Sequence, residues 1–175
     1  MKMNEIKVNG LLSRDDVKYN QKWAYHLAVP RISGTVDTLL VLSEEENLPE
    51  GPVQVKGHMY AEYIHGLGVP ITIIPDTVRE DENNGLSEAS LSGSVRKLPS
   101  YRKTKSGMPV LSVMLDTEEG PMPVLLWNHN AEKAKDLQPG DMIQVSGRLQ
   151  SRNYPDRKKN WHTTYEVSSR KYKKF

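Results

Sequence analysis

Cysteine is absent from this sequence of 175 residues, so disulfides, thiolate metal sites and cysteine nucleophiles are excluded. The absence fits a reducing cytoplasm, and we expect a cytoplasmic protein. No apolar run approaches the length that spans a bilayer, so we expect no membrane segment. The first five residues open no apolar stretch either, so no signal peptide is expected.

Signatures of catalysis are also scarce. The histidines show no metal-ligand spacing with one another or with nearby carboxylates; they are His26, His58, His65, His129 and His162. No glycine-rich loop is present that would cradle a phosphate. The acidic runs at 15–16 and 44–46 are more typical of solvated surface than of an acid/base pair. We therefore expect no enzyme, no metal and no cofactor, with a metal-dependent nuclease as a remote alternative.

What the sequence does contain is a pattern that occurs twice. The segment VQVKGHMY at 53–60 is echoed by IQVSGRLQ at 143–150, and the segment 8–12 is echoed by 91–95. The repeated glycines lie 83 residues apart at positions 10 and 93, and 90 residues apart at positions 57 and 147. A period of this length is typical of two similar domains in tandem.

The repeat and the polar stretches divide the chain into four segments. We predict an N-terminal domain over 1–78, a linker over 79–87, a C-terminal domain over 88–169 and a basic, mobile tail over 170–175. The first domain lacks most of the basic and aromatic loop residues of the second. We therefore expect it to bind weakly or to serve assembly.

Alternating or apolar stretches predict five strands in each domain. In the first domain they are 6–12, 23–29, 38–42, 53–60 and 69–75. In the second they are 91–96, 110–115, 123–127, 142–149 and 163–167, with a short helix over 131–137. This layout predicts an all-β fold of two tandem OB-fold barrels, which are five-stranded Greek keys. An SH3-like barrel is the structural alternative, but it does not predict a helix between the third and fourth strands.

Charge is divided unevenly along the chain. Residues 1–85 hold 8 Lys or Arg against 13 Asp or Glu, a net of −5. Residues 86–175 hold 16 against 9, a net of +7. Such asymmetry suggests a polyanion partner for the basic half, although uneven surface charge on a soluble protein is the simpler alternative.

Basic and aromatic residues gather at the two places where OB-folds bind their ligands, the loops joining strands 1–2 and 4–5. In the second domain these loops are 97–107 and 152–161. Single-stranded nucleic acid needs this mixture, because cations follow the phosphates while rings stack on unpaired bases. The candidate stacking side chains are Tyr154, Trp161, Tyr101 and Trp127. The candidate phosphate contacts are Arg96, Lys97, Arg102, Lys103, Lys105, Arg148, Arg152, Arg157, Lys158 and Lys159.

Some of these side chains have an alternative structural role. Arg148 and Arg152 alternate along one strand and share a face, which is either a phosphate track or the solvent face of a half-buried strand. Trp127 ends a strand and is equally suited to the core. Trp23 and Tyr25 share the apolar face of their strand, so core packing is expected there.

The second domain resembles the bacterial single-stranded DNA-binding protein family. The similar stretches are LSGSV at 91–95, Trp127 with AE at 131–132, LQPGD at 137–141, VSGRLQSRNY at 145–154 and YEV at 165–167. The resemblance implies that Tyr154 stacks on a base and that Arg148 and Arg152 contact the strand. Family members commonly end in an acidic tail with a terminal Phe, whereas this sequence ends in the basic RKYKKF.

The resemblance implies non-catalytic, sequence-independent binding of single-stranded DNA in DNA replication, recombination or repair. It also implies assemblies that present four OB-folds, which a chain with two would reach as a homodimer. A phage, plasmid or primosomal-type form is compatible with the basic end. Single-stranded RNA binding is one alternative. The other is a protein-interaction adaptor for replication proteins.

Overall fold

The computed structural model describes residues 2–175, and these form an all-β fold, as the sequence predicts. The first five strands are β1 (Asn4–Tyr19), β2 (Lys22–Pro30), β3 (Val36–Ser43), β4 (Gly51–Ala61) and β5 (Ile71–Glu80). They are followed by β6 (Ser87–Val95), β7 (Ser100–Lys103), β8 (Pro109–Thr117), β9 (Gly120–Trp127), β10 (Met142–Pro155) and β11 (Trp161–Lys174). The helix α1 (His129–Lys133) and the 3-10 turn η1 (Ala134–Asp136) lie between β9 and β10.

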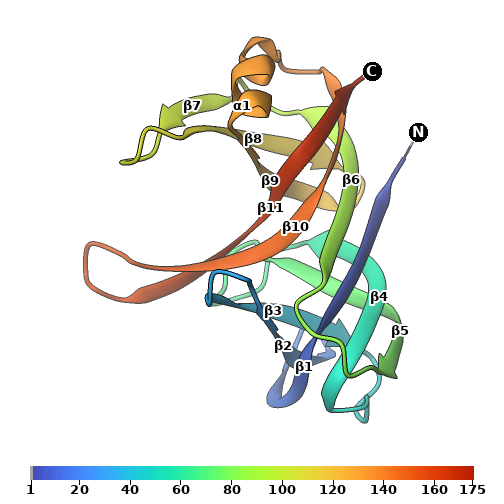
Figure 1. Cartoon of the computed structure of the whole chain (residues 1–175). Helices are drawn as coiled ribbons and strands as arrows, with labels where there is room; N and C mark the ends of the chain where they lie inside the picture. The colour runs from blue at the N-terminus through green and yellow to red at the C-terminus, as the bar shows by residue number, and fades with distance from the viewer. Residues whose placement is uncertain (1) are drawn as a thin grey trace.

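The strands pair in two groups, which we call the first half (β1–β5) and the second half (β6–β11). In the first half the order is β2-β3-β5-β4-β1, and a β1–β2 pairing joins its two ends. In the second half the order is β6-β10-β11-β9-β8, and a β6–β8 pairing joins those ends, with β7 added on β8. Figure 1 shows the two groups one above the other, with α1 at the top of the second half.

The halves are joined by backbone pairing and by a shared core. β1 pairs antiparallel with β6 from Asn4 opposite Leu91 to Val8 opposite Ser87. A single hydrophobic cluster contains buried side chains from both halves, including Val8 and Val55 of the first and Leu91 and Val145 of the second. Continuous apolar contact makes the relative position of the halves part of the fold.

The repeated glycines at 57 and 147 mark matching irregularities. Each lies at a register shift, in β4 against β5 and in β10 against β11. A Cβ atom on Gly57 would lie 2.1 Å from the Ile74 carbonyl oxygen, and one on Gly147 would lie 2.0 Å from the Ser168 carbonyl oxygen. Glycine is therefore required where two backbones approach closely at a bulge.

Three segments differ from the sequence expectation. β7 occupies part of the predicted loop 97–107, and β10 and β11 extend into the predicted loop 152–161. The residues predicted as a mobile tail belong to β11 as far as Lys174, where Tyr172 pairs with Val145. Tyr25 is fully buried, as predicted, and Trp23 is half-buried against the same core.

Candidate nucleic-acid interface

The most prominent feature of the second half is the long hairpin formed by β10 and β11. Its pairing runs from Ile143 opposite Lys174 to Pro155 opposite Trp161. In Figure 1 it extends well beyond the other strands of the second half and crosses toward β3. Residues 152–155 and 161 of the predicted loop therefore belong to the paired strands, and residues 156–160 form the turn between them.

The turn of the long hairpin is held by one carboxylate. Asp156 accepts hydrogen bonds from the backbone N–H groups of Lys158 (2.8 Å) and Asn160 (2.9 Å). His162 Nε2 lies 2.8 Å from the second carboxylate oxygen. The hydrogen bond to His162, followed by the backbone hydrogen bonds, holds the pKa of Asp156 below its usual value. These contacts fix the turn that presents Arg157, Lys158 and Lys159, which are all exposed.

Two exposed rings stand next to this turn. Tyr154 is 43% exposed, and its ring centroid lies 5.6 Å from that of His162. Trp161 is 72% exposed, which is unusual for so large an apolar surface. The structure thus brings two of the predicted stacking side chains together with three of the predicted cations at one tip.

Further along the hairpin the polar side chains pair with each other. Glu166 is buried and accepts a hydrogen bond from Gln150 Nε2 at 3.2 Å. Arg152 Nη2 lies 3.6 Å from the same carboxylate, while its side chain stays 56% exposed. Arg152 therefore keeps much of its surface open to a ligand despite this ion pair.

Arg148 is hydrogen-bonded to groups outside its own strand. Its Nε lies 3.3 Å from the carboxylate of the buried Asp37, its Nη1 donates to the Gly85 carbonyl at 3.1 Å, and its Nη2 donates to the Pro30 carbonyl at 3.4 Å. Each guanidinium nitrogen thus has an acceptor within the protein. Sequence alternation places Arg148 beside Arg152, but only the fold shows that it reaches the first half.

A second basic group surrounds the short strand β7. Arg102 and Lys103 are exposed on β7, Lys105 follows in the turn, and Lys97 precedes it. Arg96 Nε donates to Asp116 Oδ1 at 2.6 Å, so this guanidinium is paired. These cations are carried by a hairpin separate from the long one.

Tyr101 on β7 is held against α1. Its hydroxyl donates a hydrogen bond to the Glu132 carboxylate, and Lys135 Nζ lies 4.2 Å from the ring centroid. The hydrogen bond to Glu132 raises the pKa of the Tyr101 phenol. One face of this ring is therefore already covered by a cation.

Trp127, at the end of β9, is half-buried. Its indole N–H donates to the Ser168 hydroxyl at 2.9 Å, which fixes the orientation of the ring. It lines a pocket of ≈ 570 Å³ together with Arg31, His129 and Arg170, none of which is a predicted binding residue. We call this pocket the Trp127 groove.

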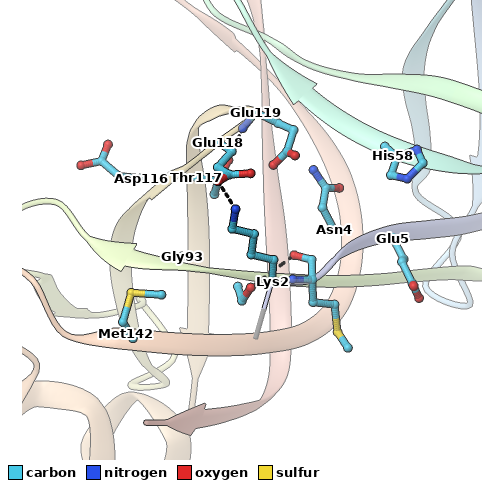
Figure 2. Close-up of a pocket in the computed structure, with 12 residues that line it drawn as sticks. Lys2, Asn4, Glu5, His58, Gly93, Asp116, Thr117, Glu118, Glu119 and Met142 are labelled. Atoms are coloured by element: carbon cyan, nitrogen blue, oxygen red, sulfur yellow. Dashed lines mark hydrogen bonds and ion pairs between the residues drawn. The ribbon is translucent and has the colours of Figure 1, made fainter.

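A further pocket, of ≈ 530 Å³, has the opposite character. Glu5, Asp116, Glu118 and Glu119 line it, and Lys2 forms an ion pair with Glu118 (Figure 2). Four carboxylates against one ammonium group make this pocket unsuited to a polyanion.

No group of three or more His, Asp or Glu side chains among residues 2–175 is arranged to hold a metal ion. Among the helices of residues 2–175, none has the length and apolar character needed to cross a membrane.

Comparison with known proteins identifies a family for this chain. The model of the single-strand binding protein family matches residues 86–175. The crystal structure of wild-type single-stranded DNA binding protein from Thermus aquaticus is similar with a TM-score of 0.78 and 20% identity, covering 99% of this chain and 93% of that chain. A deletion mutant of the same protein gives a TM-score of 0.74 and 20% identity, covering 99% of this chain and 95% of that chain. No curated protein matches the sequence significantly.

At this identity the structural likeness shows a shared fold that extends over both halves. The family model covers more than half of the chain, including β10, β11 and Trp127. The resemblance predicted from the sequence is confirmed, and the chain belongs to the single-strand binding protein family.

Proposed function

We propose that this protein binds single-stranded DNA without strong sequence preference and without catalysis. The observation that carries the proposal is the tip of the long hairpin, where Tyr154 and Trp161 are exposed beside Arg157, Lys158 and Lys159. Exposed rings offer stacking surfaces to unpaired bases, and the cations neutralise the phosphates between them. Membership of the single-strand binding protein family supports the same conclusion.

We further propose that the two halves are tandem OB-fold barrels. The supporting observation is that both halves have the same pairing order, closed by β1–β2 in one and by β6–β8 in the other. The matching glycines at the β4 and β10 bulges support a common origin of the two units. A homodimer would then present four barrels, with roles in DNA replication, recombination or repair.

Within this surface the contributions are unequal. Tyr154 and Trp161 are the main stacking groups, Trp127 is a third, and Tyr101 contributes less because Lys135 covers one face of its ring. Phosphate contacts come from the exposed cations of both hairpins, namely Lys97, Arg102, Lys103, Lys105, Arg152, Arg157, Lys158 and Lys159. Arg96 contributes less, because its guanidinium is paired with the Asp116 carboxylate. Arg148 joins the halves instead.

The test is a titration of labelled oligo-dT with the protein, followed by fluorescence anisotropy at several salt concentrations. The logarithm of affinity should fall linearly with the logarithm of salt, by about 0.7 for each phosphate contact. The double variant Tyr154→Ala/Trp161→Ala should lose roughly 30-fold or more, since each stacked base is worth about 1–3 kcal/mol. Tyr63→Ala, which removes a ring that is 65% exposed in the first half, is the matched control and should retain affinity.

The outcomes separate the alternatives. An unchanged affinity in the double variant would show that the binding surface is assigned to the wrong place. Absence of binding by the unmodified protein at low salt would favour the adaptor function, in which the basic hairpins meet another protein. Stronger competition by a matched RNA than by DNA would favour an RNA ligand, because only RNA offers the 2′-hydroxyl.

A further inference from the structure

The Trp127 groove lies where the first half meets the second. Its walls come from Trp127 at the end of β9, from His129 and Asn130 of α1, from Gln150 of β10 and from Arg170 of β11. Arg31, which follows β2 in the turn toward β3, is contributed by the first half. A volume of ≈ 570 Å³ falls within the range of sites that hold small organic ligands, and a nucleotide unit is of that size class.

Arg31 is held in place by a buried carboxylate. Its Nε and Nη2 donate to the two oxygens of Asp37 at 3.0 and 2.6 Å, and Asp37 is fully buried. Nη2 also donates to the Ser151 carbonyl at 3.3 Å. The third nitrogen, Nη1, has no acceptor among residues 2–175, and the side chain remains 27% exposed. A guanidinium clamped along one edge keeps its remaining donors oriented for a second acceptor.

The groove has the charge and the ring that a nucleotide requires. Arg31 and Arg170 both line it, and no carboxylate side chain does so among the described residues. This contrasts with the acidic pocket that contains Lys2. The Trp127 ring is fixed by its hydrogen bond to Ser168, so a base that stacks on it would meet a preorganised surface.

We propose that the Trp127 groove is a nucleotide subsite shared by the two halves, in which Arg31 of the first half binds a phosphate of the DNA strand. Asp37 is a positioning residue, because it acts through the orientation of Arg31. The proposal rests on the single-stranded DNA binding proposed above and extends the path of the strand from the long hairpin onto the first half.

The experiment compares Arg31→Gln with Arg148→Gln. Both substitutions leave Asp37 one arginine and offer it an amide N–H donor, but only the first removes a cation from the groove. Anisotropy titrations with labelled oligo-dT would be run across a salt series for each variant and for the unmodified protein. For Arg31→Gln we expect roughly tenfold weaker binding at low salt and a salt dependence smaller by about 0.7 in slope. For Arg148→Gln the slope should remain that of the unmodified protein.

The outcomes are distinguishable from failure of the proposed function. If the unmodified protein binds DNA and Arg31→Gln binds with the same affinity and slope, the subsite is refuted while DNA binding stands. Equal loss of slope in both variants would also refute it, because the effect would then come from the contact between the halves. If Arg31→Gln does not fold, Arg170→Gln tests the other arginine that lines the groove. Its guanidinium makes no ion pair among residues 2–175, and it should lose a similar slope.

Discussion

Replacing Asp37 by alanine should destabilise the protein more than the loss of a surface carboxylate does. Asp37 is fully buried and accepts hydrogen bonds from Arg31, from Arg148 and from the backbone N–H of Ser151 (3.1 Å). These donors come from both halves, so the Asp37 carboxylate connects the long hairpin to β3 through hydrogen bonds. The adjacent Thr38 N–H donates to the Ser151 hydroxyl at 2.9 Å and belongs to the same contact.

The expected magnitude follows from burial. Removal of one partner from a buried ion pair typically costs about 3–5 kcal/mol, because the remaining charge is left without compensation. Here the arginine side chains are 27% and 26% exposed, so water can partly solvate them after the change. We therefore expect a loss of about 2–4 kcal/mol in the free energy of unfolding. For a chain of this length that corresponds to a fall in Tm of roughly 4–16 °C.

Thermal unfolding followed by circular dichroism would measure the change. Asp76→Ala is the matched control, because it removes a carboxylate of the same half that is 58% exposed and 3.2 Å from His58. The control should change stability by less than about 0.5 kcal/mol. If the Tm of Asp37→Ala stays within about 2 °C of the Tm of that control, the Asp37 carboxylate does not stabilise the contact between the two halves.

Four further predictions concern the strands and the titrating groups. Gly147→Ala should lower the free energy of unfolding, measured by urea denaturation, by roughly 3 kcal/mol, because the new Cβ would lie 2.0 Å from a backbone oxygen. Gly140→Ala is the control and should lower it by about 1–2 kcal/mol, because Gly140 has open space around it but a φ of +94°. Equal losses in the two variants would contradict the bulge argument. Hydrogen bonds hold the pKa values of Asp81, Asp141 and Asp156 below their unfolded values, so their stabilisation is complete only above about pH 5, where the unfolded carboxyls are also ionised, and is lost as pH falls through the folded pKa values. His162→Ala should raise the pKa of Asp156 toward its usual value in an NMR titration, and an unchanged value would show that the backbone N–H groups dominate. Glu132→Gln should lower the pKa of the Tyr101 phenol in an ultraviolet titration, and no change would refute the hydrogen bond between them.

Strand positions were predictable where one face is apolar. The alternation in β2 buries Tyr25, Leu27 and Val29, and the structure confirms that face. β7 was not predictable, since only Tyr101 among its four residues offers an apolar surface, and the strand is held largely by backbone pairing with β8. The extension of β11 through Lys174 was missed for the same reason. There the lysines obscure Tyr172, whose half-buried ring packs against the core.

The residue types of the candidate site were predictable from the sequence, but the contacts between distant residues were not. The basic and aromatic run at 152–161 identifies the tip of the long hairpin. Its side chains are exposed through a turn within the run itself, so no contact with a distant segment had to be predicted. Arg148 and Arg31 could not be assigned in the same way, since their roles depend on Asp37, which is distant from Arg148 in the sequence. A signal did exist, because Asp37 lies in a mostly apolar strand, and a buried carboxylate there requires cationic partners.

The charge difference between the halves describes whole segments, whereas a phosphate contact depends on one side chain and its immediate surroundings. The first half has an excess of acidic residues, but they are dispersed over its loops and strands, and several are exposed. At the contact between the halves the local balance is reversed, because Arg31, Arg148 and Arg152 outnumber the two carboxylates of Asp37 and Glu166. Screening limits the influence of charges further away than about 10 Å at ordinary salt. A DNA strand in the Trp127 groove would therefore meet the positive charge of Arg31 rather than the net charge of the half that carries it.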